Sequence, residues 1–144
     1  MIKLNWQKFS CAYSENIIIM KLEELIQIID GKMMTPGVPM NQEIKGGCGA
    51  DLMSDVLASI QPNAVLLTGL CTPQVVRTAM MADVAAIVFV RGKTPQPETI
   101  SLAEEESIPL IQAPYGMFEL CGRLFKYGLP SLEKSIPDGL CECD

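Results

Sequence analysis

The chain has 144 residues, of which 49% are hydrophobic and 19% charged, and its formal net charge is −6. This length suits one domain with a buried core, and the apolar content excludes a disordered chain. Its 11 basic residues are scattered along an acidic sequence, which disfavours duplex nucleic acid and anionic membranes as partners.

The first segment, residues 1–19, has no clear hydrophobic period, and three alternatives stay open for it: an added strand, a loose arm or the product of an upstream start. From Met20 the run MKLEELIQIIDG predicts an amphipathic helix that ends at Gly31. We therefore expect an N-terminal extension over 1–19, a domain over 20–129 and a partly ordered tail over 130–144. The residues on the apolar face of that helix are Leu22, Leu25, Ile26 and Ile29.

The next segment, KMMTPGVPMNQEIKGG, predicts short strands around residues 32–35 and 43–45, followed by a turn at Gly46 and Gly47. Residues 50–60 predict a second amphipathic helix. We expect its apolar residues Leu52, Met53, Val56, Leu57 and Ile60 to face inward, and Asp51, Ser54, Asp55 and Ser59 to face solvent. Asp51 and Asp55 are interpreted as charges that complement the start of the helix dipole rather than as a catalytic pair.

The rest of the domain alternates between strands and helices. Continuous apolar runs predict strands over 64–68, 85–90 and 109–113, and helices are expected over 73–82, 97–106 and 115–127, the first with Thr72 as N-cap and Pro73 at its first position. Short apolar strands separated by helices indicate parallel strands covered on both faces. The predicted fold class is therefore α/β, a three-layer structure with a mostly parallel sheet between helices.

The segment VRGKTP contains the Gly-Lys-Thr triplet that ends a phosphate-binding P-loop. A P-loop also needs a glycine five positions before its last glycine, and here Ile87 occupies that position within a strand. Pro95 and Pro97 follow the triplet in place of an immediate helix. The sequence therefore excludes a P-loop kinase.

A second use of these loops is a ligand site, because ligands of parallel α/β sheets bind beyond the carboxyl ends of the strands. Three loops meet there, and their glycines, hydroxyls, cations and helix starts suit a nucleotide or another small anion. The alternative is that the glycines only make turns, Thr72 only caps its helix and the cations are solvated. The candidate ligand-binding residues are Thr68, Gly69, Leu70, Thr72, Arg91, Gly92, Lys93 and Tyr115.

No catalytic residue, metal or cofactor is predicted. Histidine is absent, which removes the commonest general base and metal ligand. A metal centre from Cys141 and Cys143 with Cys121 is disfavoured, and reduced thiols are expected for all six cysteines, which also include Cys11, Cys48 and Cys71. Arg77 is interpreted as a surface or ion-pair residue, with Asp83 or a partner subunit as its counterpart. With no apolar run of about 18 residues and no signal-like start, a cytoplasmic protein is expected.

Three segments resemble a known family. They are GGCGADLMSDVLA, AVLLTGLCTPQVVRTAMMADVAAIVFVRGKTP and ETISLAEEESIPLIQAPYGMFELCGRLFKYGL. Over residues 20–129 the chain resembles stand-alone DRTGG-domain proteins, most distinctively in the Gly-Cys-Gly-Ala-Asp-Leu-Met-Ser-Asp segment. The sequence departs from the family where VRGK replaces a glycine-rich strand end, and the five letters of the family name do not occur in order.

The resemblance implies an α/β domain like the N-terminal domain of HPr kinase-like proteins, often dimeric and regulatory. Related domains occur in phosphotransacetylases and in pyrophosphatases with cystathionine-β-synthase (CBS) domains. Stand-alone members are commonly encoded near iron-only hydrogenase subunits, which implies a redox-enzyme partner. We therefore expect a non-catalytic, homodimeric regulatory domain that senses a nucleotide or small anion. The alternatives are an assembly factor with an apolar surface near Met80–Met81 or Met117–Phe118, and an enzyme of phosphoryl or acyl transfer using Lys93 or Cys71.

Overall fold

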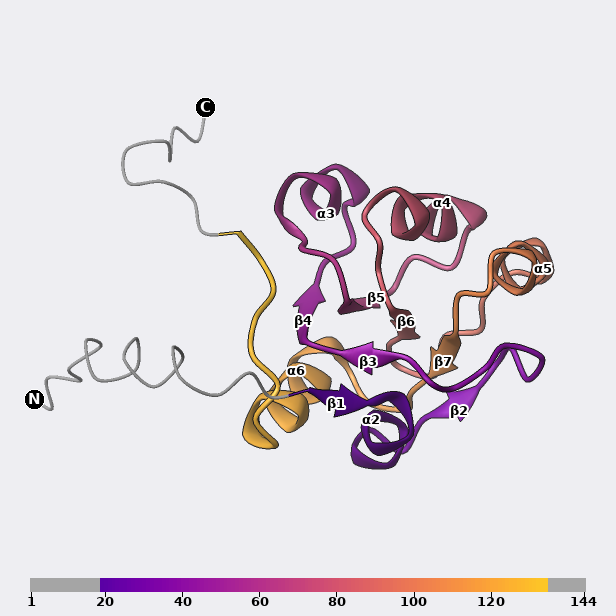
Figure 1. Ribbon diagram of the computed structural model, residues 1–144. Helices are drawn as coiled ribbons and strands as arrows, with labels where there is room; N and C mark the ends of the chain where they lie inside the picture. The colour runs from indigo at the N-terminus through magenta and orange to yellow at the C-terminus, as the bar shows by residue number, and fades with distance from the viewer. Residues whose placement is uncertain (1–18, 135–144) are drawn as a thin grey trace, which may run out of the picture.

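A five-stranded sheet forms the centre of the protein, whose computed structural model describes residues 19–134 (Figure 1). The strands follow the order β2-β7-β6-β5-β4. Strands β4 to β7 run parallel, whereas β2 pairs antiparallel with β7 at one edge. The strand bounds are β2 (Lys32–Met33), β4 (Gly46–Gly49), β5 (Ala64–Thr68), β6 (Ala86–Phe89) and β7 (Leu110–Gln112); β1 (Met20–Lys21) and β3 (Glu43–Ile44) form a separate antiparallel pair.

Helices cover both faces of this sheet, which confirms the predicted three-layer α/β fold. One face is covered by α3 (Met53–Ser59), α4 (Pro73–Met81) and α5 (Pro97–Glu105), and the other by α2 (Leu22–Ile28) and α6 (Met117–Lys126) (Figure 1). Strands β5 and β6 are short and apolar because helices cover both of their sides. In β5 every residue is buried, with Val65 and Leu67 in the core beneath α2 and α6, and Leu66 in the core beneath the other three helices.

Two predictions about the first helices are wrong in detail. Helix α2 begins at Leu22, because Met20 and Lys21 pair with Ile44 and Glu43 in the small sheet. Leu52 and Leu57 are 60% and 43% exposed rather than buried. Leu52 precedes α3 in an extended conformation, so the helical period does not apply to it, and Leu57 lies one position beyond the buried Val56.

Strand β4 was predicted as a turn, because its sequence GGCG lacks an apolar run. It is the edge partner of β5, and residues 130–132 continue the sheet beyond it. The Gly47 N–H donates to the Pro130 carbonyl at 2.9 Å, and the Leu132 N–H donates to the Gly47 carbonyl at 3.0 Å. A Cβ at Gly46 would lie 2.5 Å from Leu132 Cγ, so glycine is needed for this close approach. Residues 130–134, the first part of the expected tail, are therefore hydrogen-bonded to the domain. The division of the chain at residues 19/20 and 129/130 stays a prediction.

Four helices end in the same way, with one residue in the left-handed conformation. The φ angles are 51° at Asp30 after α2, 52° at Asp83 after α4, 56° at Ser107 after α5 and 98° at Gly128 after α6. In each case the next residue donates its N–H to a carbonyl of the last helical turn, as Ile108 does to Ala103 at 2.9 Å. This is the Schellman arrangement, which turns the chain back toward the sheet. Only one of these four positions is glycine, so few of these helix ends could be predicted from the residue type.

Candidate functional site

The candidate site lies at the carboxyl edge of the parallel strands, where four loops meet. Besides the three expected loops after β5, β6 and β7, the loop between β4 and α3 contributes Asp51. Its Oδ1 atom accepts the Gly69 N–H at 2.7 Å and the Thr68 hydroxyl at 3.2 Å. The Thr68 oxygen in turn accepts the Leu70 N–H at 3.2 Å. Asp51 is exposed, as predicted, but its carboxylate also organises the loop after β5, a role that was not predicted.

Lys93 reaches the same loop from the neighbouring strand. Its Nζ donates to the Gly69 carbonyl at 3.2 Å. The position that a Cβ of Gly69 would take is 3.1 Å from Lys93 Nζ and 3.4 Å from Asp51 Oδ1. Glycine therefore lets an ammonium and a carboxylate approach the same piece of backbone, and the two charges lie on either side of Gly69.

The loop after β6 is a tight turn. Arg91 and Gly92 have φ angles of 55° and 63°, and the Lys93 N–H donates to the Val90 carbonyl at 3.1 Å, which together define a type I′ turn. The Gln112 side-chain amide donates to the Gly92 carbonyl at 2.9 Å and to Thr94 Oγ1 at 3.1 Å. Sequence reasoning missed Gln112 because it lies at the end of an apolar strand.

Four backbone N–H groups of these loops already have hydrogen-bond acceptors within the protein. The N–H groups of Arg91 and Gly92 donate to the carbonyls of Tyr115 and Ala113, each at 2.7 Å. Those of Gly69 and Leu70 are bound to Asp51 and Thr68, as described above. Because these donors point into the protein, an anion at this edge has to be held by the side chains of Arg91 and Lys93 and by the start of α4.

The start of α4 has the predicted N-cap residue but not the hydrogen bond that its side chain usually makes. Pro73 is the first helical residue, as expected. Thr72 has the extended conformation of an N-cap, with φ −84° and ψ 160°, yet its side chain makes no capping hydrogen bond. The Cys71 carbonyl before it accepts the Thr99 hydroxyl at 2.7 Å and the Gln96 N–H at 3.1 Å, so α5 fixes this loop.

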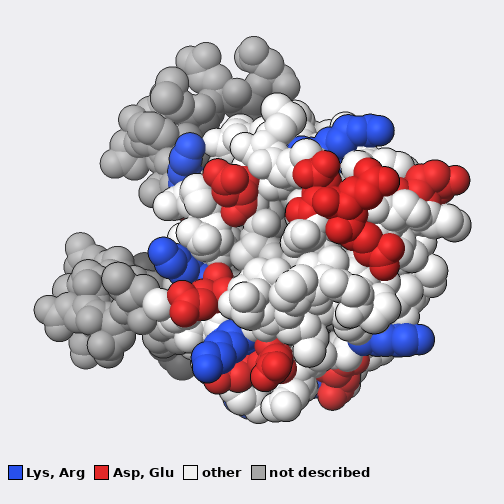
Figure 2. Space-filling view, turned by 45° about the vertical axis from the view of Figure 1, so that its right-hand side comes forward, with Lys and Arg blue, Asp and Glu red and all other residues white. Residues whose placement is uncertain are grey.

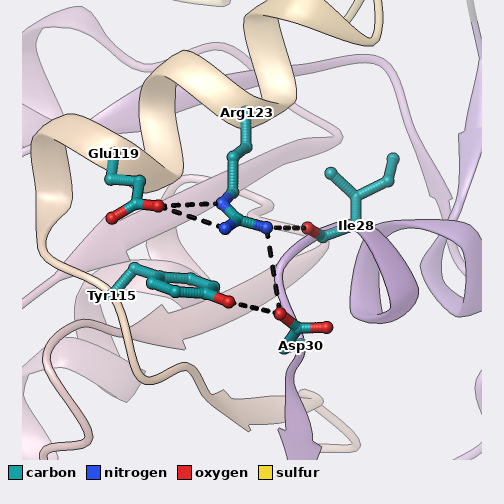
Figure 3. Close-up of polar contacts among 5 residues, drawn as sticks. All are labelled: Ile28, Asp30, Tyr115, Glu119 and Arg123. Atoms are coloured by element: carbon teal, nitrogen blue, oxygen red, sulfur yellow. Dashed lines mark hydrogen bonds and ion pairs between the residues drawn. The ribbon is translucent and has the colours of Figure 1, made fainter.

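Tyr115 is turned toward α2 (Figure 3). Its hydroxyl donates to the Asp30 carboxylate, and this hydrogen bond raises the pKa of Tyr115 above its usual value. Arg123 stacks on the Tyr115 ring at 3.8 Å from the ring centre. The guanidinium also contacts Glu119 at 3.1 Å, Asp30 at 3.8 Å and the Ile28 carbonyl at 3.4 Å. These contacts connect the two helices on one face of the sheet, and a ligand role for Tyr115 stays a prediction.

The thiols of Cys48, Cys71 and Cys121 are free. Burial raises the pKa of Cys71, and nearby Lys93 opposes that rise. Burial, then a hydrogen bond with Glu133, raises the pKa of Cys48 to about 12. These thiols are therefore neutral near pH 7 and are poor nucleophiles. Among residues 19–134 no group of three or more Cys, Asp or Glu side chains is placed to hold a metal ion; Cys11, Cys141 and Cys143 lie outside that range.

Charged side chains of both signs lie on the face that Figure 2 shows. On the face that Figure 2 draws, Lys and Arg side chains of the described chain stand apart from one another, and acidic side chains gather in its upper part. Arg77 is exposed on α4, and within the described range it makes no ion pair, with Asp83 or any other acid. No helix within residues 19–134 is both long and apolar enough to cross a membrane.

A wide hollow of about 740 Å³ lies at the opposite, amino edge of the sheet, where no site was predicted. Its lining includes Asn63, Asp83 and Ser107 from the helix-to-strand turns, together with Lys45. The Gln42 Oε1 atom is buried there without a hydrogen-bond partner. The hollow combines both charge signs and is open, so its chemistry selects no particular ligand.

The sequence matches the model of a known protein family. The DRTGG domain model matches residues 24–126, most of the chain. The chain belongs to the DRTGG-domain family. The match agrees with the resemblance seen in the sequence and ends near the last residue of α6. No match was found among curated proteins.

A solved DRTGG structure has a similar fold. It contains the CBS and DRTGG domains of the regulatory region of a Clostridium perfringens pyrophosphatase, in complex with the activator diadenosine tetraphosphate. The TM-score is 0.62 at 15% sequence identity, and the match covers 93% of this chain. This chain spans 62% of that one, so the two differ in domain content. At this identity the comparison establishes the fold alone.

Proposed function

We propose that this protein is a non-catalytic regulatory domain that binds a nucleotide or another small anion at the carboxyl edge of its sheet. The observation that carries the proposal is the pair of cations on one turn: Arg91 is exposed, and Lys93 is held over the loop after β5 by Gly69. Membership of a family whose solved relative is a regulatory region complexed with a nucleotide supports it. In this proposal the protein acts in the cytoplasm as a homodimer.

The remaining predicted residues surround the two cations. Thr68, Gly69 and Leu70 fix the backbone on one side, and Gly92 sets the turn. Because hydrogen bonds already order these loops, the protein loses little conformational entropy when a ligand binds. Thr72 offers a hydroxyl at the start of α4, and Tyr115, whose ring is stacked by Arg123, lies in the loop after β7.

The same geometry disfavours catalysis. The Lys93 ammonium donates a hydrogen bond to the Gly69 carbonyl, and burial raises the pKa of the Cys71 thiol. Neither group is therefore an activated nucleophile. Asp51, the nearest carboxylate, uses one oxygen to hold backbone and hydroxyl groups. An enzyme of phosphoryl or acyl transfer would need a base beside one of these groups.

Thermal unfolding in the presence of candidate ligands tests the proposal. ATP, ADP, AMP, diadenosine polyphosphates and acyl phosphates are compared, and a ligand that binds only the folded state stabilises it by about 2.7 kcal/mol at 100 times its Kd. The shift should disappear in Arg91→Asn/Lys93→Met, in which asparagine suits the left-handed turn and methionine keeps an unbranched side chain without the charge. No shift at millimolar ligand concentration would contradict the proposal.

A matched control removes the same number of positive charges at positions outside the site. Lys32 and Lys45 are exposed and lie outside the four loops, so Lys32→Asn/Lys45→Met removes two charges while leaving the site intact. This control should retain the ligand-induced shift. An equal loss of the shift in both double variants would mean that net charge, and not the site, attracts the ligand.

The second candidate function is an assembly factor for a redox enzyme of the hydrogenase type. Met80 and Met81, which end α4, are 41% and 74% exposed, and exposed apolar side chains of this kind suit a protein partner. Purification from the native host would separate the two functions. A stoichiometric redox-enzyme subunit that is lost from Met81→Ser, together with no ligand-induced shift, would favour assembly.

A further inference from the structure

The solvent-facing side of helix α6 has two exposed phenylalanines and a glycine. Phe118 is 94% exposed and Phe125 is 55% exposed, whereas Leu120 and Leu124 on the opposite face are buried. At 100° per residue the outward face is Phe118, Glu119, Gly122, Phe125 and Lys126. A large aromatic side chain that is almost fully exposed suggests a surface for another protein, because burying it would stabilise a complex.

Gly122 is in the middle of this face, and the fold of one chain gives no reason for it. It is the only glycine inside a helix of the described chain, and a Cβ placed there would meet no atom within 4 Å. A glycine within a helix costs about 1 kcal/mol relative to alanine. By contrast, Gly46 is crowded by Leu132, and Gly92 has a positive φ. What Gly122 does allow is the close approach of a second helix.

The charges around Gly122 select the partner and its direction. Phe118 lies four residues before Gly122 and Lys126 four after, while Glu119 lies three before and Phe125 three after. If two copies of α6 pack antiparallel about Gly122, each Phe118 lies beside the partner's Phe125 on one side of the interface, and each Glu119 lies beside the partner's Lys126 on the other. Parallel packing would instead place Lys126 against the partner's Lys126. The face is therefore complementary to itself in the antiparallel orientation, as a two-fold interface requires.

We propose that the homodimer included in the proposed function forms through antiparallel packing of α6 on α6 of a second copy, with the two-fold axis at Gly122. The two helix dipoles then oppose one another, and the aromatic rings fill the space on either side of the two glycines. Because α6 follows the loop of Tyr115 and Gly116, the dimer brings the two candidate ligand sites onto one assembly.

Substitution of Gly122 tests the proposal on the full chain. Sedimentation equilibrium should give twice the chain mass of 15.7 kDa for the wild type and one chain mass for Gly122→Gln at the same concentration. Below the concentration at which the wild type dissociates, Gly122→Gln should resist urea as well as the wild type or better, because glutamine is the stronger helix former. Loss of the dimer with no loss of chain stability is a result that misfolding does not produce.

Charge reversal tests the orientation. Lys126→Glu places two acids together across the axis and should weaken association by about tenfold or more. Lys126→Glu/Glu119→Lys restores opposite charges across the axis and should recover much of that loss. Ser101→Gln on the exposed side of α5 is the control for an added side chain, and it should stay dimeric.

Three results would overturn the proposal. A wild type that stays monomeric at about 100 μM, which includes the case in which residues 1–18 or 135–144 cover this face, contradicts it. So does a Gly122→Gln variant that remains dimeric, and so does a dimer that dissociates with Met81→Ser instead. The ligand-induced shift is measured separately on Gly122→Gln, so failure of the interface and failure of the ligand site give different results.

Discussion

The Asp51 carboxylate accepts the Gly69 N–H at 2.7 Å, which joins the loops that follow two neighbouring parallel strands. A charge-assisted hydrogen bond of this kind stabilises a protein by about 1–2 kcal/mol when it is partly exposed. Asp51→Ala should lower the free energy of unfolding in urea by that amount, and Asp51→Asn, which keeps an acceptor oxygen, by less. Asp55→Ala, which removes a nearby exposed acid, should cost under about 1 kcal/mol. An equal loss in the free energy of unfolding for Asp51→Ala and Asp55→Ala would mean that the hydrogen bonds of Asp51 do not stabilise the loops.

The same carboxylate also lies beside the proposed ligand. Because its charge opposes an anion near Lys93, Asp51→Asn should increase the ligand-induced shift in melting temperature relative to the wild type. A smaller shift would indicate that the loop after β5 is held in its binding conformation by the charge of Asp51. In that case geometry, and not charge repulsion, would control the site.

Gly46 allows the chain after α6 to lie against β4. Gly46→Ala places a Cβ 2.5 Å from Leu132 and 2.6 Å from the Pro130 carbonyl, so the segment must move, at a cost of about 1–3 kcal/mol. We expect a lower urea midpoint and faster protease cleavage within residues 130–134. Gly47→Ala is the matched control, since its Cβ would meet its nearest atom at an ordinary 3.6 Å. Similar cleavage of the two variants would show that the close approach is unimportant.

Ser107 ends α5 with a φ of 56°, a conformation that costs a non-glycine residue about 1–2 kcal/mol. Glycine removes that cost but gives the unfolded chain more freedom, so Ser107→Gly should stabilise the protein by about 0.5 kcal/mol. The same substitution at Ser101, which is inside α5, should destabilise it by about as much, because the backbone there is helical. Opposite signs in urea unfolding would confirm the strain, and equal signs would refute it.

The buried thiol of Cys48 makes stability depend on pH in the alkaline range. Its pKa is 9.0 in an exposed chain and about 12 in the folded protein, so between these values the folded state holds a proton that the unfolded state has released. The free energy of unfolding should therefore fall as pH rises above 9, by up to about 1.4 kcal/mol per pH unit from this group. Cys48→Ala should reduce this slope. An unchanged slope between pH 8 and 10.5 would rule out Cys48 as its source.

The regular part of the fold could be predicted because its strands carry their own signal. The run AVLLT over residues 64–68 is buried on both sides, so an apolar run of that length predicts both the strand and its neighbours. Strand β4 could not be predicted, because its glycines serve contacts with residues 130–132, which are distant in sequence. The late start of the first predicted helix had a similar cause, since pairing with β3 overrides the helical preference of Met20 and Lys21.

The sequence predicted which loops meet at the candidate site but not the hydrogen bonds between them. Lys93 and Gly69 were expected to lie together, because the carboxyl ends of neighbouring parallel strands meet, and they do. Asp51 was missed, because nothing near it in sequence reveals that its acceptor faces an N–H 18 positions away. The orientation of Tyr115 was missed for the same reason, since Asp30 lies in the turn after α2, 85 positions earlier in the sequence.

The position of residues 130–134 also affects how the chain can fold during synthesis. Strand β4 is made early and can pair with β5 soon afterwards, but its other side has no partner until the last part of the domain leaves the ribosome. An unpaired strand edge can bind the edge of another chain. A nascent chain from which α6 has emerged, but residues 130–134 have not, would therefore have its sheet nearly complete and yet remain open to association with its neighbours on the same messenger RNA.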